Sequence, residues 1–177
     1  MTGPRGDLSR GQFPATSPTQ PAGPTLLGLL SLLEPQYRWT RKTFFGYVTE
    51  FLTLGVSATV TNQVGIQSDS DFLITYATCI VTDTTNLIQL PFIPQLVQLY
   101  DSAAGVSFFL LPEHAMNVYG DAMNPGIFAI PYVMRAASTL GVQHQNLEAT
   151  ARNVRCAFNG FRSYPGTDTR DPKWQTR

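Results

Sequence analysis

Two cysteines and two histidines are the residues of this 177-residue chain best suited to nucleophilic or metal chemistry. Cys79 and Cys156 lie in apolar runs typical of strands, His114 lies in a loop-like segment, and His144 ends a predicted strand. A catalytic thiol needs an exposed, electropositive setting beside a histidine. Because both thiols alternate into apolar faces, we expect two buried thiols and no catalytic residue. Spacing alone leaves open whether the two thiols form a disulfide.

The polar residues form no recognisable cofactor or metal site. Two cysteines and two scattered histidines lack the spacing of a zinc site. Asp69-Ser70-Asp71 comes nearest to a calcium site, but it lacks the dense oxygen ligands of an EF-hand. Aspartates at turns usually accept hydrogen bonds from the local backbone, and no glycine-rich loop leads into a helix to hold phosphate. We therefore expect a protein without cofactor, metal or enzymatic activity.

The composition favours a protein whose surface is buried against other subunits of an assembly. Charged residues make up 14% of the chain and the formal net charge is zero, against roughly 25% charged residues in ordinary soluble domains. A chain with little self-repulsion tends to associate. Nucleic acid would require a basic stripe, and a membrane span would require about 18 consecutive apolar residues. We expect neither partner, and the N-terminus lacks the apolar core of a signal peptide.

Residues 71–83 are predicted to be the central strand of an all-β domain. The segment contains no glycine or proline and is rich in β-branched and aromatic residues. Strict alternation would put Leu73, Thr75, Ala77, Cys79 and Val81 on one face, and Phe72, Ile74, Tyr76, Thr78, Ile80 and Thr82 on the other. Neither set is charged, so we expect one face in a core and the other at least half covered.

About eight short strands separated by turns are predicted, with no long helix. The nine candidate segments from which this count comes are residues 44–51, 56–66, 71–83, 95–101, 106–111, 127–130, 132–136, 138–143 and 152–161. We expect 56–66 and 71–83 to form a hairpin, residues 112–125 to be a long loop, and Val154, Cys156 and Phe158 to point inward. This pattern is typical of a jelly-roll-like β-sandwich over residues 43–165, with a flexible tail over 166–177.

Residues 1–42 are predicted to be an extended arm. Residues 1–24 are rich in proline and glycine and cannot bury enough apolar surface to offset their ordering entropy. Three leucine pairs follow: Leu26, Leu27, Leu29, Leu30, Leu32 and Leu33. This leucine block fits either a short helix capped by Thr25 or an extended arm in a groove. It needs cover from its own domain or from a neighbouring subunit, and both alternatives stay open.

Two sets of residues are predicted to contact a partner. The first set lies in the arm and consists of the six leucines together with Tyr37 and Trp39. The second set lies in the loop and consists of Met116, Tyr119 and Met123. Local packing is the alternative for the loop residues.

Three segments carry a resemblance to a known family. They are the two-strand opening 56–83 around Ser68-Asp69-Ser70-Asp71-Phe72, the run 97–105, and the closing segment 152–161. In these segments residues 43–164 resemble the jelly-roll cement, auxiliary or decoration proteins of tailed-bacteriophage capsids. The resemblance implies a virion protein on the capsid surface, made in the host cytoplasm. It would clamp neighbouring major-capsid subunits and associate with copies of itself, as a homodimer or a higher oligomer.

Two other functions fit the same patterns. A long arm also suits a head–tail, collar or tail accessory protein of the virion, including one that anchors a fibre. A carbohydrate-binding β-sandwich is the competing class, and it would present exposed aromatic side chains, for which Tyr119 and Tyr132 are the candidates.

Overall fold

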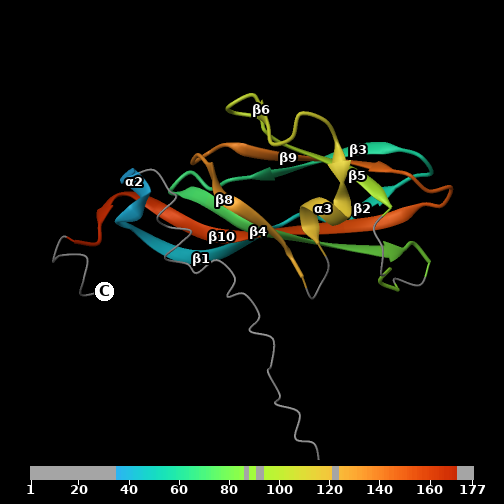
Figure 1. The fold of residues 1–177 in the computed structure, drawn as a ribbon, viewed down its shortest axis with the longest axis horizontal. Helices are drawn as coiled ribbons and strands as arrows, with labels where there is room; N and C mark the ends of the chain where they lie inside the picture. Colours follow the sequence, from blue (N-terminus) through green and yellow to red (C-terminus); the bar gives the residue numbers. More distant parts are fainter. Residues whose placement is uncertain (1–34, 86–87, 91–93, 121–123, 171–177) are drawn as a thin grey trace, which may run out of the picture.

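The computed structural model describes residues 35–85, 88–90, 94–120 and 124–170. Within these residues two antiparallel sheets pack face to face, which confirms the all-β sandwich (Figure 1). The leucine block, the rest of residues 1–34 and Met123 lie outside the described residues, so the predictions made for them are not addressed by the structure.

The first sheet has the order β1-β10-β4-β8. Its strands are β1 (Thr40–Val48), β10 (Arg152–Asp168), β4 (Asp71–Asp83) and β8 (Gly126–Met134), and β2 (Leu52–Leu54) also pairs with β10. Strand β1 therefore begins inside the segment that we expected to be arm, and β10 runs into the expected tail. Helix α2 (Pro35–Arg38) precedes β1.

The second sheet has the order β3-β9-β5-β6. Its strands are β3 (Thr59–Gly65), β9 (Thr139–Asn146), β5 (Gln95–Asp101) and β6 (Val106–Ser107), and β7 (Glu113–His114) also pairs with β5. The turn predicted at residues 102–105 joins β5 to β6 as expected, because Asp101 accepts hydrogen bonds from the amides of Ala103 and Ala104.

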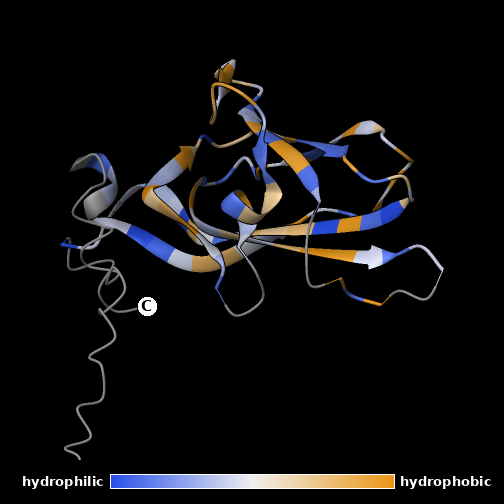
Figure 2. Ribbon diagram, turned by 45° about the vertical axis from the view of Figure 1, so that its right-hand side comes forward, coloured by the Kyte–Doolittle hydropathy of each residue, from blue (hydrophilic) through white to orange (hydrophobic). Residues whose placement is uncertain are grey.

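The core lies between the two sheets, where apolar side chains of both layers meet. Phe72 and Ile74 of β4 and Phe158 of β10 are fully buried there, together with Leu140 and Val142 of β9. Figure 2 shows hydrophobic residues alternating with hydrophilic ones along several of these strands. The predicted inward set Val154, Cys156 and Phe158 is confirmed, because all three are at most 1% exposed.

The predicted hairpin of residues 56–66 and 71–83 is wrong. Among the described strands, β3 pairs with β9 alone, in the second sheet, whereas β4 lies between β10 and β8 in the first. The polar turn carries the chain from one sheet to the other: the Ile66 amide donates to the Ser138 carbonyl, and the Gln67 amide donates to the Tyr47 hydroxyl. A strand that is apolar on both faces is stabilised most in the centre of a sheet whose two faces are covered. Pairing with one hairpin partner does not cover those faces.

The predicted alternation along β4 is wrong at its beginning, because the strand contains a β-bulge. Ile74 pairs with Gly160 and Tyr76 pairs with Asn159, so Thr75 is an extra residue. Its hydroxyl donates to the Asn159 carbonyl at 3.0 Å. The inward positions therefore shift by one, and Phe72 and Ile74 precede the bulge in the core while Ala77, Cys79 and Val81 follow it.

The predicted loop over residues 112–125 contains strand β7 and a helical turn, α3 (Ala115–Tyr119). The helical turn forms because Ala115, Val118 and Tyr119 are buried, and their burial offsets the entropy that the segment loses on ordering. The turn fills the open edge between the sheets, next to β8 and β5 (Figure 1).

The sequence predicts three strands between residues 127 and 143, whereas the structure has two there, β8 and β9. Pro131 does not end a strand, because β8 is an edge strand and residues 128–131 bulge out between the pairs Ile74–Tyr132 and Tyr76–Ile127. Gly141 does not end β9 either. The Tyr100 ring lies where a side chain would project from Gly141, so this position of the strand is covered.

Candidate functional site

The outward-facing surface of the first sheet carries many apolar side chains, together with Thr78, Arg155 and Asn159. It presents Phe44, Val48, Tyr76, Ile80, Ile127 and Phe161, which we call the apolar face. Phe44 is 60% exposed, Ile127 56%, Val48 50% and Ile80 44%. Soluble monomers rarely expose contiguous apolar surface of this kind without a partner.

Strand pairing places apolar side chains of this face on all four main strands of the first sheet, with Thr78, Arg155 and Asn159 between them on the same side. Phe44 of β1 lies opposite Phe161 of β10, with their rings 5.8 Å apart edge to face, and Phe161 lies opposite Leu73 of β4. Tyr76 of β4 in turn lies opposite Ile127 of β8. The rows are adjacent because cross-strand side chains on one face stand about 5 Å apart.

The outward-facing surface of the second sheet has the opposite chemistry. Its exposed or half-exposed side chains are mostly neutral and polar, among them Thr59, Thr61, Gln63, Gln98, Gln143 and Gln145. Two cross-strand hydrogen bonds, Gln143 to Thr61 and Gln98 to Ser107, tie this layer together. A solvated outer face of this type is usual for an antiparallel sheet, so the first sheet is the one that lacks cover.

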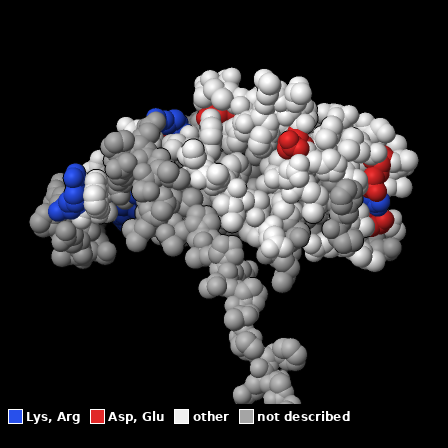
Figure 3. Space-filling model, viewed as in Figure 1, with Lys and Arg blue, Asp and Glu red and all other residues white. Residues whose placement is uncertain are grey.

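Charged side chains are few around these surfaces. Figure 3 shows a largely uncharged surface in the view of Figure 1, with charged side chains mainly toward its two ends. At one end Arg152 pairs with Glu148 at 2.5 Å and with Asp83 at 3.4 Å. On the apolar side Arg155 lies over the Phe51 ring at 5.2 Å and donates to the Thr49 carbonyl.

Tyr37 does not offer a partner contact, contrary to the prediction. Its side chain is 4% exposed and packs on Leu73 and Val133, on the outward side of the first sheet. Its hydroxyl donates to Asp71 at 2.9 Å, and the guanidinium of Arg135 lies 5.5 Å from its ring centre. Tyr37 therefore attaches α2 to its own domain.

Burial, together with the hydrogen bond to Asp71, raises the pKa of Tyr37 to about 12. Asp71 also accepts a hydrogen bond from the Ala136 amide at 2.8 Å and lies 3.5 Å from Arg135. A cavity of about 210 Å³ opens beside this group, lined by Gln36, Tyr37, Thr40, Asp71, Arg135, Ser163, Pro165 and Gly166. The network fixes the point at which the N-terminal segment enters the domain.

Trp39 remains a candidate contact, because it is 50% exposed. The guanidinium of Arg170 lies 5.3 Å from the centre of its ring. Of the two predicted arm contacts that the structure describes, Tyr37 and Trp39, only Trp39 has a substantial exposed surface.

The predicted loop contacts are largely internal. Tyr119 is fully buried, which excludes it as a surface contact and as an exposed aromatic side chain for carbohydrate. Met116 is half-buried and packs against the core. Tyr132 is half-buried as well, with its ring 3.9 Å from that of Phe108. These positions pack locally because α3 folds into the edge of the sandwich.

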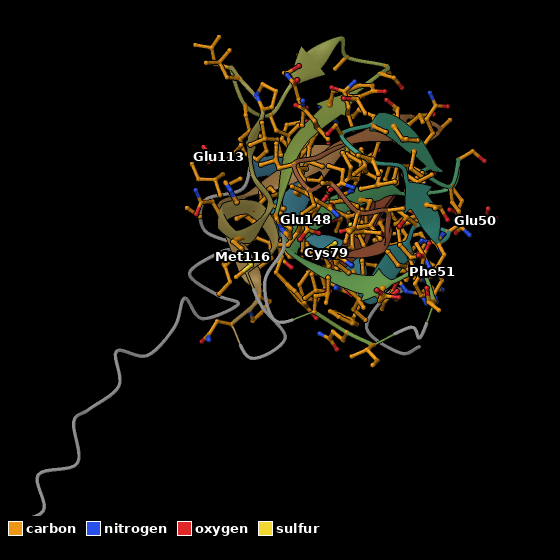
Figure 4. All side chains as sticks on the ribbon, turned by 90° about the vertical axis from the view of Figure 1, so that its right-hand side faces the viewer. Glu50, Phe51, Cys79, Glu113, Met116 and Glu148 are labelled. Atoms are coloured by element: carbon orange, nitrogen blue, oxygen red, sulfur yellow. The ribbon has the colours of Figure 1, made fainter. Side chains whose placement is uncertain are left out.

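The two cysteines meet in the core. Both thiols are buried, as predicted, and both are free, a question that the sequence left open. Their sulfur atoms lie 3.0 Å apart across β4 and β10. Figure 4, with Phe51 and Glu50 at the periphery, places Cys79 in the interior. Cys156 Sγ also lies 3.5 Å from His144 Nε2, and His144 Nδ1 lies 3.2 Å from Gln95 Oε1.

The electrostatics of this thiol cluster are asymmetric. Burial and the neighbouring Cys156 raise the pKa of Cys79 well above its ordinary value. Burial acts in the same direction on Cys156, but the contacts with Cys79 and His144 outweigh it and lower the pKa of that thiol. Burial also raises the pKa of Tyr119, whose ring stacks on His144 at 5.9 Å between centres. Cys156 is therefore the more acidic of the two thiols.

In the described part of the chain no three His, Cys, Asp or Glu side chains are grouped so that they could hold a metal ion. The carboxylate of Asp69 pairs with Arg162, and that of Asp71 is engaged by Tyr37, so the nearest calcium-like sequence is committed to protein partners. No helix within the described ranges is both long and apolar enough to cross a membrane.

Sequence reasoning missed both the apolar face and the thiol cluster. The sequence shows that neither face of residues 71–83 is charged. It does not show the β-bulge at Thr75, which shifts the inward-facing positions by one. His144 alternates inward with Leu140 and Val142, a period of two that places it in the core opposite the cysteines. Its contact with Cys156 depends on the packing of two sheets, which spacing does not reveal.

Comparison with known proteins assigns no family to this chain. No family model matches it, and no curated protein matches it.

Proposed function

We propose that this chain is a structural virion protein without enzymatic activity, a cement protein on the capsid surface of a tailed bacteriophage that clamps neighbouring major-capsid subunits. The observation that carries the proposal is the apolar face, which has exposed side chains on β1, β4 and β8; among the described residues Tyr37 of α2 covers only its end at Leu73 and Val133. A major-capsid subunit is the occupant that we assign to this face.

The strand order supports the proposal. We interpret the orders β1-β10-β4-β8 and β3-β9-β5-β6 as a jelly roll, because consecutive strands repeatedly cross between the two sheets. Jelly rolls recur in viral capsid and lectin domains. Since fold alone does not determine function, this is supporting evidence for the class only.

The position of α2 supports the same conclusion. Tyr37 covers Leu73 and Val133 on the outward side of the first sheet, so α2, the first described element, lies beside the apolar face. The leucine block ends two residues before Pro35. Arm and apolar face can therefore engage one partner as a continuous surface, with the arm ordering as it binds. The zero net charge also permits close contact with other subunits.

Reconstitution with capsids that lack the protein tests the proposal. We expect the chain without residues 1–33 to stay folded, because β1 to β10 do not include them, and to lose capsid binding. In the full-length chain Ile80→Asp should reduce bound copies at least about 100-fold, because taking a carboxylate out of water in an apolar interface costs several kcal/mol, and Arg155 opposite it is already engaged by Phe51 and the Thr49 carbonyl. Quantitative sedimentation of loaded capsids measures both effects.

Thr61→Asp is the matched control. Thr61 is an exposed, outward-facing strand residue on the polar second sheet, so its substitution introduces the same charge away from the apolar face. Its binding should equal that of the unmodified chain. Normal capsid loading by the truncated chain or by Ile80→Asp would contradict the proposal. Binding confined to the connector end of the particle would favour a head–tail or collar protein instead.

A further inference from the structure

The backbone geometry at Cys79 and Cys156 is that of a close cross-strand pair. The two residues lie opposite each other on β4 and β10. The Cys156 amide donates to the Thr49 hydroxyl, and its carbonyl accepts from the Thr49 amide, both at 2.9 Å. Both backbone groups of Cys156 thus point away from β4. Cys79 and Cys156 are therefore a non-hydrogen-bonded pair, the type with the shorter Cα separation of about 4.5 Å.

This separation is compatible with a disulfide. Disulfides join residues whose Cα atoms are about 4.4–6.8 Å apart, with the sulfur atoms about 2.05 Å from each other. The free thiols already stand 3.0 Å apart. A side-chain movement of about 1 Å would form the bond without moving either strand.

His144 is placed to accept a proton from Cys156. Its Nδ1 faces the amide oxygen of Gln95, which can only accept, so Nδ1 carries the hydrogen of the neutral ring. The unprotonated Nε2 then faces the Cys156 sulfur at 3.5 Å. The Tyr119 ring stacks on the imidazole and limits its movement.

We propose that Cys79 and Cys156 are a redox modification site that a small peroxide converts to an intramolecular disulfide, with Cys156 as the attacking thiol and His144 as its positioning base. Cys79, His144 and Tyr119 are the titratable groups that face Cys156, from β4, β9 and α3.

The reaction balances with hydrogen peroxide as oxidant. His144 takes the Cys156 proton, and the thiolate attacks one peroxide oxygen, so that the O–O bond breaks and Cys156 becomes a sulfenic acid. The departing hydroxide takes the proton back from His144 as water. The Cys79 sulfur then attacks the Cys156 sulfur, its own proton leaves with the sulfenic hydroxyl as a second water, and the disulfide forms.

Access explains why a small neutral oxidant is required. Cys156 is 1% exposed and Cys79 8%, and Tyr119 of α3 lies over the cluster from the open edge of the sandwich. Because α3 is a single helical turn, brief local opening there admits a molecule the size of peroxide more readily than a bulky disulfide reagent. Once formed, the bond joins β4 to β10, the two central strands of the sheet that bears the apolar face.

Peroxide titration of the full-length protein tests the proposal. We expect loss of both thiols, a mass decrease of two hydrogens, a linked peptide pair containing Cys79 and Cys156, and a higher Tm after oxidation. The thiols should be counted after denaturation with an excess of alkylating reagent. Survival of both thiols, or formation of a disulfide-linked dimer, would overturn the proposal.

Single-cysteine variants test the assigned roles. Cys79→Ala should accumulate a sulfenic acid at Cys156 that dimedone captures, whereas Cys156→Ala should keep Cys79 reduced at least 10-fold longer. His144→Gln should move the pH profile of oxidation to higher pH, a readout that loss of packing alone would not produce. Circular dichroism establishes that each variant is folded. Equal oxidation rates of the two cysteine variants would contradict the role given to Cys156.

Discussion

At the scale of single residues, the buried polar groups serve to hold elements together. Tyr37 and Asp71 connect α2 to β4, and Asn146 connects the segment before β3 to the loop after β9 through the carbonyls of Gly55 and Thr150. Tyr37, Asp71 and Asn146 each have a hydrogen-bond partner, as most buried polar side chains do. The bonds of Tyr37 to Asp71 and of Asn146 to Gly55 join residues far apart in sequence, so neither follows from local spacing.

Tyr37 predicts a specific alkaline loss of stability. Its pKa is raised to about 12 in the folded protein, from an ordinary value of 10.0. The neutral phenol is therefore favoured by folding, so its contribution is complete below pH 10 and is lost as the pH rises through 12. Urea unfolding from pH 9 to 12 should show a steeper decline for the unmodified chain than for Tyr37→Phe, which lacks the titrating group.

The difference between the two pH profiles isolates Tyr37, because Tyr119 and Tyr132, whose pKa values are also raised, are present in both proteins. Parallel profiles over this range would show that Tyr37 is not buried against Asp71 in solution.

At the scale of elements, the sequence allowed the strands to be recognised but not their partners. Residues 71–83, 95–101 and 152–161 form strands as predicted, because residues 71–83 are rich in β-branched and aromatic residues and apolar residues recur at every second position over 154–158. The predicted hairpin is wrong because a polar turn between two strands has the same sequence pattern whether the chain returns to its own sheet or crosses to the other. Pro131 and Gly141 were misleading, since an edge strand and a covering tyrosine ring accommodate them.

The bulge in β4 could not be predicted from β4 itself, since it depends on Gly160 of β10. A Cβ atom at that position would lie 1.8 Å from the Leu73 carbonyl oxygen. Gly160→Ala should therefore destabilise the domain by about 3 kcal/mol, because the clash is with backbone that cannot move aside cheaply. The Tm should fall by on the order of 10 °C in a thermal unfolding scan.

Gly65→Ala is the control for this substitution. Gly65 ends β3, and an added Cβ there meets nothing within 4 Å. The change should stay within about 0.5 kcal/mol. Equal stabilities of the two variants would show that the close approach of β4 and β10 at the bulge does not exist.

At the scale of the whole molecule, the two outer faces of the sandwich differ in a way that composition alone does not reveal. Thr and Gln side chains cover the second sheet, whereas aromatic and aliphatic side chains cover the first. The low content of charged residues indicates association, but only the strand order in the two sheets shows which face is exposed. Among the described residues, Trp39 is the one predicted arm contact that is exposed. The apolar face is the larger candidate surface for a partner.

This asymmetry predicts how the protein behaves without its capsid. Because the apolar face is exposed and the net charge is zero, the chain lacking residues 1–33 should self-associate through that face as its concentration rises. Ile80→Lys in the truncated chain should restore a monomer, since a charge on the central strand opposes burial of the face, whereas Thr61→Lys should not. Light scattering coupled to size exclusion measures the masses. A truncated chain that stays monomeric at every concentration would mean that the face is too small to drive contact by itself, and the binding energy would then have to come from the arm.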